Sequence, residues 1–164
     1  MKIQHDWDYF FLQFARQCAN QSYDPKRKVG CVITRRDRII SYSYNGTVPG
    51  WDNVLRGPDG KTLPSVIHAE AYAIAKVARS NDSTEGATLY CTLAPCIECS
   101  KLIVTSGISR VVFEDSYKCD SGINFLIKAK IETTQYDGDR IYYHYYPSHE
   151  DYADPKWVAL NTGL

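Results

Sequence analysis

The chain has 164 residues, enough for one domain with a buried core but too few for two comfortable ones. Lysine plus arginine and aspartate plus glutamate both total 19, so the chain lacks the basic excess usual in proteins that bind nucleic-acid backbones. It has no apolar run that could cross a membrane and no secretory-signal pattern, so we expect one cytoplasmic domain over residues 1–164 with a small-molecule ligand.

Helical and strand patterns alternate along the chain. Apolar residues recur at helical spacing in residues 6–20, and two β-branched and aromatic runs, 28–36 and 38–44, predict a hairpin. Later patterns predict helices at 68–80, 95–107 and 121–130 and strands at 87–93, 109–115 and 131–136. This order predicts an α/β sandwich around one mixed sheet.

Two segments do not follow this alternation. Residues 45–65 form a long stretch rich in Gly, Pro, Asn and Asp, and loops of that length are usually functional or disordered. The last 28 residues, 137–164, carry five acidic and two basic side chains, a poor composition for a nucleic-acid arm. Their alternating aromatics over 141–146 favour an added strand or an oligomer contact, with plain core packing an equal alternative.

The stretch "TLAPCIECSKLI" places Cys96 and Cys99 three residues apart at the start of a predicted helix. That spacing alone fits a redox pair, a structural metal site or a catalytic centre. His68 precedes Cys96 by 28 residues at the start of another predicted helix, and together the three form a nitrogen and sulfur ligand set that suits zinc. We expect the other four cysteines, Cys18, Cys31, Cys91 and Cys119, to be buried small hydrophobic residues.

Three protein ligands leave one coordination position free for water, so the pattern favours a catalytic site. Glu70, two residues after His68, is suited to move the protons that hydrolysis at such a site requires. A closed structural site would need a fourth ligand, and His5, His144 and His149 lie near the chain ends. A thioredoxin-like redox pair and a core histidine remain as weaker alternatives. The complete pattern, H-x-E followed by P-C-x-x-C, is the signature of zinc nucleobase deaminases.

Three further segments extend this pattern: "SYDPKRKVGCVI", "IISYSYNGTVPGWDN" and "GATLYCTLAPCIECSKLIVTSGISRVVFEDSY". With "VIHAEAYAI", they make residues 6–136 resemble the deoxycytidylate (dCMP) deaminases of the cytidine deaminase superfamily. The resemblance implies a three-layer α/β/α cytidine-deaminase-like sandwich with a central five-stranded mixed sheet. It also implies zinc-dependent hydrolysis of dCMP to dUMP and ammonia for thymidylate synthesis, by a homo-oligomer that in this family is often a hexamer. Residues 137–164 are then an aromatic C-terminal extension.

Carried over position by position, the resemblance implies that His68, Cys96 and Cys99 hold the zinc and that Glu70 is the catalytic acid and base. Asn45 would contact the sugar and the base edge, although Asn45-Gly46 is also a common turn signal. Substrate contacts are further expected at Tyr117, for which simple packing is the alternative, and at Ala69.

Regulation by dCTP and dTTP with magnesium is also implied, at a segment near the effector or substrate phosphates: Tyr44, Gly46, Thr47, Gly50 and Trp51. Independently of the resemblance, the basic segment from Lys26 to Lys28, with help from Ser22, could balance the charge of a monophosphate, and a solvated basic turn is the alternative.

Three other functions remain open. The enzyme could also act on dCTP, or a base in tRNA or single-stranded DNA could be the substrate on the same zinc scaffold. In the third alternative the chain is a non-catalytic zinc-binding module, which requires Glu70 to be idle.

Overall fold

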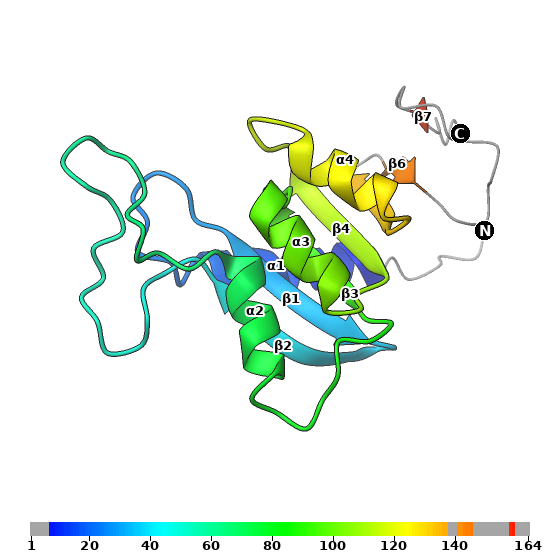
Figure 1. Ribbon diagram of the computed structural model, residues 1–164, viewed down its shortest axis with the longest axis horizontal. Helices are drawn as coiled ribbons and strands as arrows, with labels where there is room; N and C mark the ends of the chain where they lie inside the picture. The colour runs from blue at the N-terminus through cyan, green and yellow to red at the C-terminus, as the bar shows by residue number, and fades with distance from the viewer. Residues whose placement is uncertain (1–6, 138–140, 146–157, 160–164) are drawn as a thin grey trace.

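The computed structural model describes residues 7–137, 141–145 and 158–159, and a mixed β-sheet forms its centre (Figure 1). The strands are β1 (Gly30–Arg35), β2 (Arg38–Tyr44), β3 (Thr88–Leu93), β4 (Arg110–Asp115), β5 (Glu132–Tyr136), β6 (Ile141–Tyr145) and β7 (Val158–Ala159). Their order is β2-β1-β3-β4-β5-β6-β7. Strand β4 runs parallel to β3 and β5, and the other neighbours pair antiparallel. The predicted five-stranded mixed sheet is confirmed as β1 to β5, and β6 and β7 extend it.

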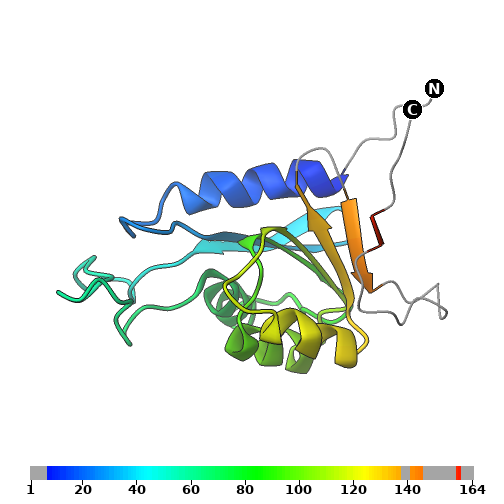
Figure 2. The same ribbon diagram turned by 90° about the horizontal axis from the view of Figure 1, so that it is seen from above.

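Helices cover both faces of the sheet, which confirms the three-layer α/β/α arrangement. Helix α1 (Trp7–Ala19) packs on one face, while α2 (Ala69–Val77), α3 (Ile97–Thr105) and α4 (Ser121–Lys128) lie on the other (Figure 2). The predicted helices and strands of residues 6–136 all form, with ends shifted by up to three residues. No helix in the described part of the chain combines the length and apolar character needed to span a membrane.

The core is divided by the sheet into two apolar layers. Because successive side chains of a strand point to opposite faces, Val111 packs toward α2, α3 and α4 while Val112 packs beneath α1. Helix α1 lies very close to β1, since a Cβ added at Gly30 would stand 1.8 Å from the carbonyl oxygen of Ala15. Only glycine fits there, and the close contact fixes the helix against the strand that begins beside the pocket described below.

The predicted extra strand over 141–146 is confirmed as β6, whose register places Tyr142 opposite Gln135 of β5; Tyr146 lies outside the described residues. Of the four remaining cysteines, Cys31 and Cys91 are buried as predicted, and Cys18 is half-buried. The prediction was wrong for Cys119, which is exposed because it lies in the connection between β4 and α4 and not in a core element.

One end of the sheet gathers the starts of two helices. Strand β2 ends at Tyr44 beside Gly30, and the amide of Gly30 donates a hydrogen bond to the Thr92 hydroxyl near the end of β3. The chain leaves β2 into the long segment of residues 45–68 and leaves β3 into α3, so α2 and α3 both begin at this end (Figure 1). In open α/β sheets, ligands bind beyond the carboxyl ends of the strands.

Candidate active site

Three side chains that could hold a metal converge at the starts of α2 and α3. His68 is the N-cap residue of α2, Cys96 is the N-cap residue of α3, and Cys99 lies in the first turn of α3. The Nδ1 atom of His68 lies 3.4 Å from Cys96 Sγ and 3.5 Å from Cys99 Sγ. A residue and its third neighbour share one face of a helix, so the two sulfur atoms point to the same side.

These distances fit zinc. A tetrahedral centre with Zn–S of about 2.3 Å and Zn–N of about 2.0–2.1 Å separates a nitrogen and a sulfur ligand by about 3.6 Å. Within the described ranges, the group of potential ligands consists of His68, Cys96 and Cys99 alone, so a tetrahedral zinc ion held by them would keep one position open. That open position is the arrangement of catalytic zinc, as the sequence predicts. The side chains of His5, His144 and His149 lie outside the described set.

The protonation of the two thiols differs. A hydrogen bond from Cys99 lowers the pKa of Cys96 to about 3; burial opposes this shift and a further hydrogen bond from His68 supports it. The same contact, together with burial, raises the pKa of Cys99. The dipole at the start of α3 also favours negative charge on both sulfur atoms. Cys96 is therefore the cysteine that ionises first, and a bound divalent cation would stabilise the thiolate of Cys99.

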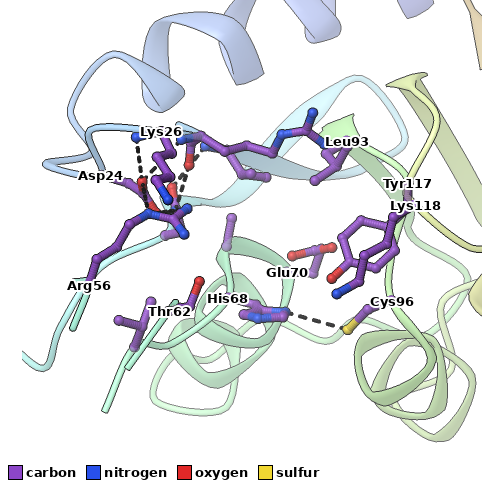
Figure 3. A pocket seen from close by; sticks show the side chains of 15 residues that line it. Asp24, Lys26, Arg56, Thr62, His68, Glu70, Leu93, Cys96, Tyr117 and Lys118 are labelled. Carbon is purple, nitrogen blue, oxygen red and sulfur yellow. Dashed lines mark hydrogen bonds and ion pairs between the residues drawn. The ribbon is translucent and has the colours of Figure 1, made fainter. Parts of the chain in front are cut away.

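Glu70 lies beside the metal ligands in the first turn of α2, and it faces the same pocket as His68 and Cys96 (Figure 3). The residue is only 4% exposed. Burial raises the pKa of its carboxyl group to about 7, against opposing contributions that include the charge of His68. A carboxyl group with a pKa near neutrality can accept and return a proton at physiological pH, which is the role predicted for it.

The pocket has a volume of about 490 Å³, within the usual range for small-molecule sites. Eight of the residues predicted from the sequence line it, namely Lys26, Arg27, Asn45, His68, Ala69, Glu70, Cys96 and Tyr117; Cys99 is buried and does not line it. The other lining residues are Asp24, Val29, Arg56, Thr62, Val66, Leu93 and Lys118.

The carboxamide of Asn45 is held in one orientation. Its Oδ1 accepts a hydrogen bond from the Val29 amide at 2.8 Å, and its Nδ2 donates to the Arg27 carbonyl at 3.0 Å and to Asp24 Oδ2 at 3.4 Å. Since a backbone N–H can only donate and a carbonyl can only accept, the amide cannot be turned over. Asn45 is therefore more than a turn residue, and one lone pair of Oδ1 remains for a ligand that donates a hydrogen bond.

Two predicted phosphate residues do not line the pocket. Ser22 is buried, and its hydroxyl donates a hydrogen bond to the Asn45 carbonyl at 2.8 Å. Lys28 is exposed, and its Nζ lies 3.4 Å from the Asn20 carbonyl. Their contact with substrate stays a prediction, whereas their neighbours Lys26 and Arg27 are at the pocket wall.

The predicted effector residues lie where the chain leaves β2, and none of them lines the pocket. Tyr44 ends β2, and Gly46 pairs with Ile67 as an isolated bridge. Gly50 has a positive φ of 90°, and Trp51 is 61% exposed. The effector role of this set, which includes Thr47, stays a prediction.

The sequence reasoning missed several lining residues, among them Arg56, Thr62 and Lys118, and Lys118 lies beside Tyr117 and Cys96 at the metal end of the pocket (Figure 3). Arg56 and Thr62 come from the long segment after β2, and Arg56 forms an ion pair with Asp24 (Figure 3). Lys118 follows Tyr117, with its Nζ 5.6 Å from the centre of that ring. Lys118 could have been predicted to line the pocket, because it follows Tyr117 in the sequence. No sequence pattern indicated that Arg56 pairs with Asp24.

Helix α4 packs tightly on the start of α3. A Cβ added at Gly122 would lie 2.0 Å from the carbonyl oxygen of Pro95 and 3.0 Å from the carbonyl carbon of Cys96. Both contacts are with backbone, which cannot rotate away as a side chain can. The backbone of a metal ligand thus rests directly on α4.

Comparison with known proteins gives a consistent result. The family model described as the cytidine and deoxycytidylate deaminase zinc-binding region matches residues 5–115, more than half of the chain. The deoxycytidylate deaminase of Saccharomyces cerevisiae is 39% identical over 127 residues, which cover 72% of this chain and 40% of that protein. The human deoxycytidylate deaminase is 32% identical over 121 residues, covering 68% of this chain and 67% of that protein. The chain thus matches less than half the length of the yeast relative.

Among solved structures, the dCMP deaminase of cyanophage S-TIM5 in complex with dCMP and dUMP has a TM-score of 0.79 and 30% sequence identity. The match covers 82% of this chain and 99% of that one.

Proposed function

The chain belongs to the cytidine and deoxycytidylate deaminase family, and from this premise we propose that it hydrolyses dCMP to dUMP and ammonia. The observation that carries the proposal is the pairing, in one pocket, of a three-ligand metal group with a buried carboxyl group. His68 lies 3.4 Å from Cys96 Sγ, and Glu70, with a pKa raised to about 7 by burial, faces the same space. A purely structural zinc site has no need for that carboxyl group.

Zinc, when bound by His68, Cys96 and Cys99, supplies a water that is activated for attack at neutral pH. Glu70 accepts a proton from the attacking water and delivers it to the ring nitrogen N3 of the cytosine. Glu70 then takes the second proton, from the hydroxyl now on C4, and passes it to the amino group, which leaves as ammonia as the C4–N bond breaks. The oxygen of the water stays on C4, and the base becomes uracil.

The phosphate of the substrate is proposed to meet the wall opposite the metal group. Lys26 and Arg27 line the pocket, and neither forms an ion pair with an acid among the described residues. Asp24, the acid beside them, is already paired with Arg56. The wall therefore carries uncompensated positive charge, which suits a monophosphate.

Asn45, Tyr117 and Ala69 are proposed to place the nucleoside between these two ends. The free lone pair of Asn45 Oδ1 can accept a hydrogen bond from a sugar hydroxyl. Tyr117 offers an aromatic face, and Ala69 is fully buried at the first turn of α2 beside Glu70. These roles agree with those implied by the resemblance in sequence.

Two finer properties are also proposed. The first is regulation by dCTP and dTTP, with magnesium, at the segment from Tyr44 to Trp51, which is exposed from Val48 onward. The second is assembly into a homo-oligomer. Both follow from membership of the family, and the exposure of Trp51 is compatible with a contact made by a second molecule.

The main rival is deamination of a base in tRNA or single-stranded DNA. Such an enzyme binds a continuous chain of phosphates and needs an extended basic surface with stacking aromatics. The zero net charge of this chain and the enclosure of Lys26 and Arg27 in a pocket of about 490 Å³ favour a single nucleotide.

The experiment that tests the proposal is an ammonia-release assay on the zinc-loaded protein with deoxycytidine, dCMP, dCTP and a cytosine-containing oligonucleotide. We expect the highest kcat/KM with dCMP. Turnover of the oligonucleotide alone would overturn the proposal, and a preference for dCTP would move the substrate to a triphosphate. Addition of dCTP or dTTP to the dCMP reaction tests regulation.

A further inference from the structure

We propose that Arg56 is a positioning residue for the nucleotide pocket: through Asp24 it fixes the carboxamide of Asn45 and holds a short hairpin against the pocket wall. The inference rests on the proposed function, since it assigns to Arg56 a part in binding dCMP. Arg56 lies on the pocket wall opposite the metal group, and it precedes Glu70 by 14 positions in the sequence.

The ion pair of Arg56 and Asp24 is unusually well enclosed for a loop contact. Nε and Nη2 of Arg56 donate to Oδ1 and Oδ2 of Asp24 at 2.8 and 2.9 Å, a two-pronged contact that only arginine can make. The two side chains are 17% and 2% exposed. Burial acts to raise the pKa of Asp24, but the bond from Arg56 and two backbone donors outweigh it and hold that pKa below its usual range.

The first consequence concerns the long segment after β2. Residues 55–63 form a small hairpin in which Arg56 bridges to Thr62 and the amide of Leu63 donates to the Leu55 carbonyl at 2.9 Å. Nη1 of Arg56 also donates to the Gly60 carbonyl at the turn of this hairpin, at 3.1 Å. Because Thr62 lines the pocket, the ion pair ties one of its walls to the turn that follows α1.

The second consequence concerns Asn45. Asp24 accepts hydrogen bonds from the amides of Lys26 and Arg27 at 2.8 and 3.0 Å, and this fixes the turn whose Arg27 carbonyl receives Asn45 Nδ2. Asp24 Oδ2 also lies 3.4 Å from the same Nδ2. A single carboxylate therefore connects Arg56 to the side chain that faces the nucleoside (Figure 3 shows the Arg56, Asp24 and Lys26 contacts).

Without Arg56, Asp24 would keep a buried charge with no cationic partner, and its neighbours would rearrange to hydrate it. The turn and the Asn45 carboxamide would then lose their fixed geometry. The metal group would not, because its ligands are set by the starts of α2 and α3. The expected signature is thus a change in substrate affinity with little change in the chemical step.

The experiment compares Arg56→Gln, Arg56→Lys and the control Arg110→Gln in the zinc-loaded full chain. Arg110 is 21% exposed and pairs with Asp8 and Glu132, so it matches Arg56 in burial and in ion pairing but lies away from the pocket. We measure kcat and KM for dCMP, zinc content, melting temperature, and hydrogen exchange at the Val29 amide. That amide donates to Asn45 Oδ1 and so reports the orientation of the carboxamide.

We expect Arg56→Gln to raise KM about tenfold with kcat within about threefold of wild type, full zinc content, and faster exchange at Val29. Arg56→Lys should raise KM by a smaller factor, because an ammonium group cannot make the two-pronged contact. Arg110→Gln should lower the melting temperature while KM stays within about twofold of wild type.

The proposal is overturned if both Arg56 variants keep the wild-type KM and Val29 exchange rate, or if Arg110→Gln raises KM equally. Should Arg56→Gln fail to fold, Arg56→Lys decides alone by the same criteria. If the wild-type protein does not act on dCMP, the proposed function fails, and exchange at Val29 still decides whether Arg56 holds Asn45.

Discussion

The two ends of the pocket are built in different ways. At the metal end, His68 and Cys96 are the cap residues of two helices, and Glu70 and Cys99 lie within one turn of them. Each functional side chain is thus placed by its own local backbone. At the opposite end, the Asn45 carboxamide is held by the Val29 amide, the Arg27 carbonyl and Asp24, and Asp24 is paired with Arg56 from a loop 32 residues away in sequence.

This difference indicates how each end should fail. A change at the metal end removes a chemical group and leaves its surroundings in place, so the loss should appear in metal content or in kcat. A substitution at the opposite end removes a contact that holds the Asn45 carboxamide in place. We therefore expect a higher KM and faster local hydrogen exchange.

Removal of a metal ligand should have the largest effect. We expect Cys96→Ser to lose most of its zinc and to reduce deamination of dCMP by at least about 10³-fold, since zinc supplies the activated water. Zinc analysis of the purified variant and the ammonia assay measure both quantities. Cys119→Ser is the matched control, because Cys119 is exposed and lies outside the group. Full zinc content with wild-type turnover in Cys96→Ser would contradict the assignment.

Replacement of the proton carrier should come next. Glu70→Gln keeps the shape of the side chain, and we expect kcat to fall by about 10²- to 10⁴-fold with zinc retained. Glu98→Gln is a suitable control, since Glu98 is an acid in the first turn of α3 whose side chain is 73% exposed. Unchanged turnover in Glu70→Gln would favour the non-catalytic zinc-binding module and remove the enzyme assignment.

Removal of the free cations should have a smaller effect, confined to the phosphate. We expect the Lys26→Met, Arg27→Met double variant to raise KM for dCMP about tenfold while KM for deoxycytidine stays within about twofold. Steady-state kinetics with the two substrates separate loss of charge from loss of structure. Lys128→Met, at an exposed position in α4, serves as the control. An unchanged KM for dCMP would place the phosphate elsewhere, and an equal rise with both substrates would show loss of structure instead of loss of a phosphate contact.

The smallest expected effect is that of low pH on Asp24, which contacts the Asn45 carboxamide. The pKa of Asp24 is depressed in the folded chain, so its stabilising contribution is complete above the ordinary value of 3.8 and is lost as the pH falls through the folded value. We therefore expect the difference in unfolding free energy between wild type and Asp24→Asn to be larger at pH 7 than at pH 3. Urea denaturation at both pH values measures it, with Asp59→Asn, an exposed acid, as the control. A difference that does not vary with pH would show that folding leaves the pKa of Asp24 unchanged and would contradict the depressed value.

The division between the two ends also explains what sequence reasoning could predict. The metal group and Glu70 follow from residue spacing, because a helix start converts spacing directly into geometry. The helices and strands through residue 136 follow from periodicity. The aromatic alternation after it left an added strand, an oligomer contact and core packing open, and the structure shows the strand as β6.

The support of Asn45 could not be predicted in the same way. Arg56 stands in a stretch without periodicity, and nothing in its neighbours indicates which of the 19 acidic residues it would meet. The charge of the segment from Lys26 to Lys28 suggested a phosphate contact, but only the structure shows that Lys26 and Arg27 line the pocket while Lys28 does not. Cys119 was misassigned for the related reason that burial depends on the position of a connection as well as on residue type.

The close packing of Gly122 on Pro95 and Cys96 has a consequence for how this chain can vary. Gly122 bears no functional group, yet any larger residue would push the start of α3 away from α4 and carry Cys96 with it. A survey of inactivating substitutions should therefore recover Gly122 together with the zinc ligands. Substitutions near the metal group are thus limited by the space between α3 and α4 as well as by chemistry. Gly122, the smallest residue there, should be among the hardest to replace.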